Sequence, residues 1–242
     1  MEIIPAILPK NYEDLKNKIS LVRGFSPFVQ IDICDGVFVK STTWPFFAKA
    51  TEGEPFLEND LEQHFRRILN EEEGLPFWED IEFELDLMVH DAVENFDIYT
   101  KLGPKRIIFH IEAEEIQRDL EEFKNFLEGI DSYTRDVLEI GIALNQDTEV
   151  ETIFPLVNSV DFVQVMGIAK IGFQGEDFNE KCLEQIKTLR DKFSDLVISV
   201  DGGVNLETAP ALKSAGASRL VVGSAIFNTD DIINAIEDFR QI

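Results

Sequence analysis

The chain has 242 residues, 44% of them hydrophobic, which fits a single (β/α)₈ barrel with a full core. Its 22 basic and 47 acidic side chains give a formal net charge of −25, which argues against nucleic acids and anionic membranes as partners. Because the general potential is negative, a phosphorylated ligand would have to be held by local backbone N–H groups, a helix N-terminus or a metal.

The cysteine and terminal patterns favour a cytoplasmic setting. Cys34 and Cys182 lie far apart in the sequence and form no ligand pattern, which is typical of a reduced compartment. The segment that starts at Met1 has no basic region and no long apolar stretch, so no signal peptide is predicted. No apolar stretch is long enough to span a bilayer.

Apolar runs typical of buried parallel strands alternate with segments of helical spacing. Eight strands are predicted, at Glu2–Ala6, Phe28–Ile33, Ile81–Met88, Arg106–Ile111, Glu139–Leu144, Phe162–Met166, Leu196–Val200 and Arg219–Val222. Between the first two, Leu15, Ile19 and Val22 share one helical face. Eight such units predict one closed parallel (β/α)₈ barrel over residues 1–242, with an open doubly wound sheet as the alternative.

One long acidic segment, from Pro45 to Asp80, enlarges a βα unit of this pattern. Within it, Leu57 to Leu69 has helical spacing. Two interpretations remain open: a surface helix pair, or a lid or subunit contact that would make the protein a homo-oligomer.

Four aspartates fall at or near predicted strand ends: Asp32, Asp35, Asp86 and Asp201. The carboxyl ends of barrel strands converge on one mouth, where barrel enzymes carry out their chemistry. A pair of carboxyl groups, Asp32 and Asp201, could remove and deliver one proton on opposite faces of a substrate. For any one aspartate by itself a plain turn or loop start is the favoured interpretation, so the prediction rests on the set.

Glycines follow the last two predicted strands, as Gly202-Gly203 and Gly223-Ser224. Loops at these places commonly hold phosphate in barrel enzymes, because glycine lets backbone N–H groups approach the oxygens. The glycine-containing segment 167–178 after the sixth strand is either a mobile loop over the mouth or a plain connection.

The histidines give no metal pattern. His64, His90 and His110 have no mutual spacing typical of a zinc site. His110 ends a strand, and a structural role is favoured for it. Lys170 is interpreted as a solvated loop lysine, although it lies near the mouth and could neutralise a phosphate.

Taken in order, short motifs along nearly the whole chain resemble the ribulose-phosphate 3-epimerase family. The motifs are PAIL (5–8), DICDGVFV (32–39), LMV (87–89), FHIEA (109–113), GIALN (141–145), VM (165–166), GF (172–173), VDGGV (200–204) and GSAI (223–226). The resemblance implies a (β/α)₈ barrel of the ribulose-phosphate-binding type and a divalent metal. It also implies interconversion of D-ribulose 5-phosphate and D-xylulose 5-phosphate by moving the proton at C3.

The resemblance implies roles for the residues of this chain that stand at the matching positions of the family's motifs. Asp32 and Asp201 match the family's two acid/base aspartates, which also bind its metal. Met88 and Met166 match apolar residues that line its cavity. The implied phosphate contacts are Gly172, Gly175, Gly202, Gly203, Gly223 and Ser224.

Both histidines that bind the metal in the family are replaced, by Gln30 and by Asp86. The remaining set of Gln30, Asp32, Asp86 and Asp201 has only oxygen ligands, which favours Mg²⁺ or Mn²⁺ over Zn²⁺. The loop after strand six also departs from the family pattern, and Glu176 adds a negative charge there.

These departures leave two alternatives to an epimerase. A barrel that binds a phosphorylated sugar without turnover is compatible with the lost histidines. A lyase of the same phosphate-binding barrel group is less favoured, because the decarboxylases use Asp-x-Lys-x-x-Asp and the segment 32–35 has no lysine.

Overall fold

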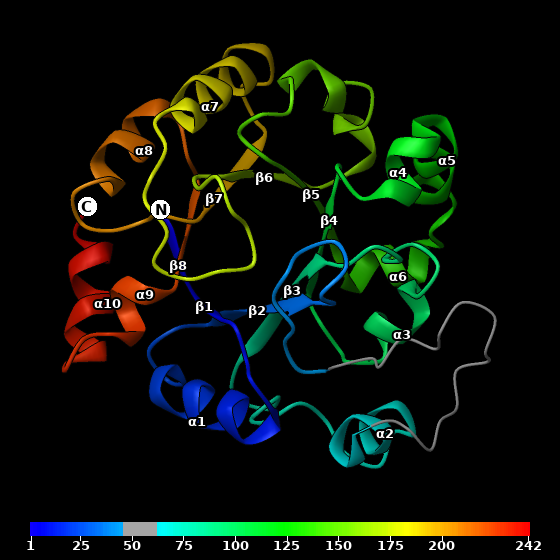
Figure 1. Cartoon of the computed structure of the whole chain (residues 1–242), viewed down its shortest axis with the longest axis vertical. Helices are drawn as coiled ribbons and strands as arrows, with labels where there is room; N and C mark the ends of the chain where they lie inside the picture. Colours follow the sequence, from blue (N-terminus) through cyan, green and yellow to red (C-terminus); the bar gives the residue numbers. More distant parts are fainter. Residues whose placement is uncertain (46–61) are drawn as a thin grey trace.

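The computed structural model describes residues 1–45 and 62–242, and the trace of residues 46–61 is drawn in grey (Figure 1). Eight parallel strands close into a barrel in sequence order, and β8 pairs with β1. The strands are β1 (Glu2–Ile7), β2 (Phe28–Cys34), β3 (Glu82–Met88), β4 (Arg106–His110), β5 (Glu139–Leu144), β6 (Phe162–Met166), β7 (Val197–Asp201) and β8 (Arg219–Val222). The predicted closed barrel is confirmed, and each predicted strand matches an observed one within one residue at either end.

Helices surround the strands (Figure 1). They are α1 (Tyr12–Val22), α2 (Gln63–Leu69), α3 (Phe96–Thr100), α4 (Glu114–Arg118), α5 (Leu120–Gly129), α6 (Ser132–Val137), α7 (Lys181–Lys192), α8 (Ala209–Ala215), α9 (Ser224–Phe227) and α10 (Ile232–Arg240), with 3₁₀ turns η2 (Val150–Ile153) and η3 (Val157–Ser159). None of the helices among residues 1–45 and 62–242 combines the length and apolar character needed to cross a membrane.

Local sequence explains where α1 begins and which face it buries. The side chain of Asn11 accepts a hydrogen bond from the backbone N–H of Asp14, which caps the helix. Leu15, Ile19 and Val22 are fully buried against the barrel, as their helical spacing predicts. The strands themselves are buried on both faces, so their apolar runs supply most of the core.

The segment 45–80 is partly described. Helix α2 covers Gln63–Leu69, with Phe65 and Ile68 buried in the core. The N-terminal part of the helical pattern predicted from Leu57 lies outside the described residues. The description of residues 1–242 as one domain with an enlarged unit, and the choice between a surface role and a subunit contact, remain predictions.

Charged side chains close the end of the barrel where the strands begin. Arg106 Nε lies 2.9 Å from Glu139 Oε2, and its Nη1 lies 3.2 Å from Oε2 of the buried Glu84. Arg219 Nε lies 3.0 Å from Glu2 Oε2, and its Nη2 lies 3.1 Å from Glu139 Oε2. This network, which we call the basal ion network, links the first residues of β1, β4, β5 and β8 around Glu84 of β3.

Candidate active site

Three aspartates meet at the opposite end, where the strands finish. Asp32, Asp86 and Asp201 lie on β2, β3 and β7, and one carboxylate oxygen of each lies within 4.8 Å of the others. All three are buried. Asp32 pairs directly with Asp86 in the β2–β3 register. Side chains alternate between the two faces of a strand, so paired residues lie on the same face, and both aspartates point into the barrel.

The amide of Gln30 bridges the predicted proton-transfer pair. Its Nε2 donates to Asp32 Oδ1 at 2.7 Å and to Asp201 Oδ2 at 3.0 Å. Gln30 is fully buried, two residues before Asp32 on the same face of β2. One side chain thus holds the two carboxyl groups at a fixed separation.

His110 contacts this group from β4. Its Nε2 lies 2.9 Å from Asp86 Oδ1, both side chains are fully buried, and Gln164 Nε2 lies 3.4 Å from Asp86 Oδ2. Burial lowers the pKa of His110, but the charge and hydrogen bond of Asp86 together with the charges of Glu112 and Asp201 outweigh burial, and the pKa lies above the ordinary value. The sequence favoured a purely structural histidine, whereas the structure pairs it with a carboxylate of the cluster.

Crowding and burial raise the pKa values of the paired acids. The pKa of Asp201 rises to about 7, first because the carboxyl group is desolvated and then because Asp86 is close. The pKa of Asp32 lies well above its usual range because of burial and then the nearby Asp201. Two carboxyl groups that share one amide donor cannot easily ionise together, so near neutral pH the pair retains a proton.

Asp35 does not join the cluster, which corrects the expectation that four strand-end acids would meet. Its Oδ1 accepts hydrogen bonds from the backbone N–H groups of Val37 and Phe38, at 2.7 and 2.8 Å. Its Oδ2 lies 2.7 Å from His90 Nδ1. Although burial opposes it, these hydrogen bonds lower the pKa of Asp35. For Asp35, the alternative interpretation as part of a plain turn at Asp35-Gly36 is therefore correct.

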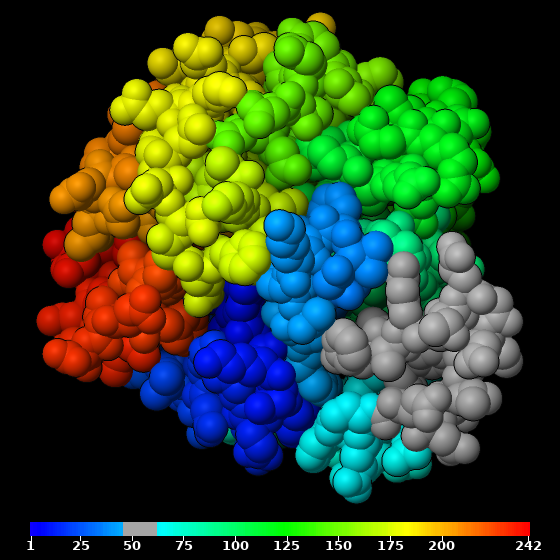
Figure 2. Space-filling model, in the orientation of Figure 1, coloured from blue at the N-terminus to red at the C-terminus, as the bar shows by residue number. Residues whose placement is uncertain are grey.

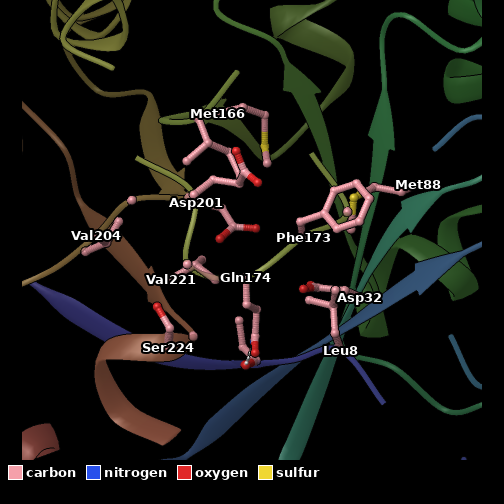
Figure 3. A pocket seen from close by; sticks show the side chains of 18 residues that line it. Leu8, Asp32, Met88, Met166, Phe173, Gln174, Asp201, Val204, Val221 and Ser224 are labelled. Carbon is pink, nitrogen blue, oxygen red and sulfur yellow. Dashed lines mark hydrogen bonds between the residues drawn. The ribbon is translucent and has the colours of Figure 1, made fainter. Parts of the chain in front are cut away.

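A small cavity of about 40 Å³ lies beside Asp32 and Asp201 (Figure 3). The glycines after β7 and β8 line it, as do Met88 and Met166. The residues predicted to contact phosphate all lie on its wall, namely Gly172, Gly175, Gly202, Gly203, Gly223 and Ser224. The structure therefore places the predicted cradle next to the paired acids.

Two loops meet over this cavity. The loop after β6 and the loop after β2 adjoin on the surface (Figure 2), and a methyl group built on Gly172 would lie 2.6 Å from Ser41 Oγ. Next to Gly172, Ile171 packs against the buried cluster of Cys34, Val39 and Met88. Gly172 has φ +81°, a backbone conformation that favours glycine.

The three aspartates and Gln30 form a donor set suited to a divalent cation. Three carboxylate oxygens within 4.8 Å of one another suit a hard cation. Burial and then the neighbouring carboxylates raise the pKa of Asp32 and Asp201, and a cation would lower both pKa values. Gln30 presents its nitrogen to the carboxylates, while its Oε1 is buried without a hydrogen-bond partner. A half-turn of the amide would add this oxygen to the set, so the residues fit such a metal.

Several residues of the site were not predicted from the sequence. Leu8, Phe173 and Gln174 line the cavity, and Gln174 is drawn at its centre (Figure 3). A signal for Gln174 existed, because it interrupts the glycines of the loop after β6. Lys170 is exposed and is not among the residues that line the cavity.

The closed barrel, with carboxylates and a glycine-lined cavity at the carboxyl ends of its strands, defines a (β/α)₈-barrel enzyme. A model of the ribulose-phosphate 3 epimerase family matches residues 69–227. The chain belongs to this family, and it is an isomerase of the epimerase type.

Individual relatives agree with the family model. The cytoplasmic isoform of ribulose-phosphate 3-epimerase from Oryza sativa subsp. japonica is 30% identical over 244 residues, which cover 99% of this chain and 93% of the relative. The ribulose-phosphate 3-epimerase of Bacillus subtilis (strain 168) is 29% identical over 248 residues, which cover 99% of this chain and 98% of the relative.

Solved structures show the same fold at lower identity. A crystal structure of 3-hexulose-6-phosphate synthase has a TM-score of 0.62 and 19% identity, over 100% of this chain and 99% of that chain. KGPDC from Streptococcus mutans in complex with D-R5P has a TM-score of 0.63 and 15% identity, over 99% and 95% of the two chains. At these identities the likeness concerns the barrel alone.

Proposed function

We propose that this protein interconverts the two C3 epimers of a phosphorylated ketose, D-ribulose 5-phosphate and D-xylulose 5-phosphate or a close analogue. Asp32 and Asp201 carry the proton. The observation that supports this most is the Gln30 amide, which bridges the two carboxyl groups beside a glycine-lined cavity.

Epimerisation requires one acid in each protonation state. The ionised carboxylate takes the proton from C3 and leaves an enediolate, and the protonated partner then donates its proton to C3 on the opposite face. The raised pKa of Asp32 and the pKa of about 7 for Asp201 support this division, with Asp32 protonated and Asp201 ionised in part of the molecules at neutral pH. In the reverse direction the two residues exchange roles.

The glycine turns provide the anion contacts that the overall charge of −25 does not. Gly202 and Gly203 have φ values of +94° and +66°, and this backbone course turns the chain after β7 tightly against the cavity. Backbone N–H groups of Gly203, Gly223 and Ser224 are the proposed phosphate donors, with Gly172 and Gly175 on the facing loop.

A divalent cation, Mg²⁺ or Mn²⁺ in preference to Zn²⁺, would be held by Asp32, Asp86 and Asp201 with Gln30. When bound, it would supply positive charge next to the oxygen on which the enediolate charge develops. His110 keeps Asp86 oriented through the 2.9 Å contact. Both cysteines are buried free thiols, which supports the cytoplasmic setting we propose.

The test is exchange of the C3 proton of D-ribulose 5-phosphate with solvent deuterium, followed by NMR with Mg²⁺, Mn²⁺ or Zn²⁺ added. We expect exchange at C3 and appearance of the xylulose epimer. A protein that binds the sugar phosphate without exchange would instead be the binding-only barrel. Loss of carbon dioxide or of a carbon fragment would identify a lyase.

A further inference from the structure

Gln174, on the loop between β6 and α7, extends its amide into the glycine-lined cavity. Its Nε2 donates to the backbone carbonyl of Ala6 on β1 at 3.0 Å. The amide also lies against the turn after β8, because a methyl group built on Gly223 would lie 2.7 Å from Nε2 and 3.2 Å from Cδ. Figure 3 shows this side chain among the residues that line the cavity, between Ser224 and Asp32.

This position coincides with the proposed phosphate cradle. The cavity that remains measures about 40 Å³. Sites for small organic ligands commonly enclose roughly 300–1,000 Å³, so this cavity, with the Gln174 amide among its walls, is too small for a sugar phosphate. Gly223, one of the proposed phosphate donors, is next to the Gln174 amide instead.

The side chain is free to leave. Gln174 is exposed as a residue, and only its amide end reaches the cavity. A second space of about 340 Å³ adjoins the same loop and is lined by Gly175, Gly203 and Ser224 among others. The amide can therefore move outward without disturbing the buried core.

We propose that Gln174 sets the affinity of the site by competing with the phosphate group of the ligand for the cradle. In the free protein, the hydrogen bond to Ala6 holds the loop in the occluding position. Ligand binding breaks that hydrogen bond and displaces the amide, and the observed affinity is reduced by the equilibrium between the two positions. The inference rests on the proposed function only for the identity of the phosphorylated ligand.

The size of the effect follows from the contact that is lost. Exchanging one ordinary neutral hydrogen bond for contact with water changes an equilibrium constant about fivefold. Gln174→Ala removes the amide without introducing the backbone freedom of glycine. It is therefore expected to bind phosphate about fivefold more tightly than the unsubstituted protein.

The experiment measures binding of inorganic phosphate by isothermal titration calorimetry to the unsubstituted chain, Gln174→Ala and a matched control. The control is Gln117→Ala, which removes a similar hydrogen bond, from Nε2 to the backbone carbonyl of Ile111 at 2.7 Å, outside the cavity. We expect a lower Kd for Gln174→Ala alone. In turnover, KM for the sugar phosphate falls in the same proportion, with a smaller change in kcat.

An equal or higher Kd in Gln174→Ala overturns the inference, since the amide would then be neutral or a phosphate donor. Lack of phosphate binding in both proteins also overturns it. Because this titration needs no turnover, its result is independent of the C3 exchange assay. Exchange at C3 with an unchanged phosphate Kd would leave the epimerase standing and remove only the role of Gln174.

Discussion

The two ends of the barrel differ in whether their buried charges have partners of opposite charge. At the end where the strands begin, Arg106 and Arg219 contact Glu2, Glu84 and Glu139 within 3.3 Å in the basal ion network. At the mouth, the cluster of Asp32, Asp86 and Asp201 has one basic partner in contact among the described residues, His110.

The difference separates stability from function. Buried ions are tolerated when partners offset the loss of hydration, as in the basal ion network. Burial still raises the pKa of Glu84 to about 7 there, although Arg106 opposes the shift. The mouth keeps an unbalanced negative cluster, and such an arrangement is retained where protons are transferred or a cation is bound.

The largest expected effect comes from removing one acid at the mouth. Asp201→Asn should lower the rate of C3 deuterium exchange by at least about a hundredfold, because general acid–base groups contribute factors of this size. Its thermal midpoint should not fall, since the substitution removes a desolvated charge. Asp97→Asn, exposed on α3, is the control and should exchange normally. Normal exchange in Asp201→Asn would eliminate this residue as a proton carrier.

At the basal end, removing one charged side chain should lower the free energy of unfolding. Arg106→Met leaves the buried Glu84 without its partner and should lower the free energy of unfolding in urea by about 3–5 kcal/mol. Arg67→Met removes a partly exposed ion pair with Glu73 and should change the free energy of unfolding by less than about 1 kcal/mol. Equal losses in the two variants would contradict the contrast between buried and exposed pairs.

A divalent cation should stabilise the protein by binding at the mouth of the barrel and not at the basal ion network. Mn²⁺ at about a hundred times its Kd should raise the free energy of unfolding by about 2.7 kcal/mol. Asp86→Asn should abolish that increase. Asp91→Asn tests the other group of potential ligands, formed by Asp35, His90 and Asp91, and should retain it. A Mn²⁺ response lost only in Asp91→Asn would place the cation at His90.

The smallest effect, taken per pH unit, is expected in the pH dependence of the free energy of unfolding. The folded-state pKa of Asp201, about 7, lies above the ordinary value of 3.8, so between these values the folded protein binds more protons than the unfolded chain. Stability should therefore fall as pH rises from about 4 to about 7, by up to about 1.4 kcal/mol per pH unit for each such group. The raised pKa of His110 acts in the same direction. Its stabilising contribution is fully present below pH 6.5 and is lost as the pH rises above the folded-state pKa of His110.

Urea midpoints at pH 5, 6, 7 and 8 measure this slope. The overall negative charge contributes a similar trend, so the informative quantity is the difference between the unsubstituted chain and Asp201→Asn. The variant should show the shallower slope. Parallel slopes would mean that Asp201 titrates normally in the folded state.

The barrel could be predicted because its signals are local. A run such as Phe162–Met166 is apolar at every position except Gln164, and such runs recur eight times with helical spacing between them. The candidate acids followed from the rule that barrel strands converge at their carboxyl ends, which is correct for Asp32, Asp86 and Asp201. The same rule failed for Asp35, because it lies beyond the last residue of β2 and its carboxylate is used by the turn.

By itself the sequence determined the fold class, the family and the three aspartates that meet at the mouth, because apolar periodicity and strand-end positions are properties of neighbours along the chain. Tertiary structure alone decided which atoms meet: the Gln30 amide between Asp32 and Asp201, His110 on Asp86, and Gln174 on Ala6. Apart from the hydrogen bond from Gln30 to Asp32 within β2, each of these contacts joins different strands or loops, and its distance depends on how the barrel closes. The pKa values that follow depend on that closure too, since desolvation and proximity exist only in the folded state.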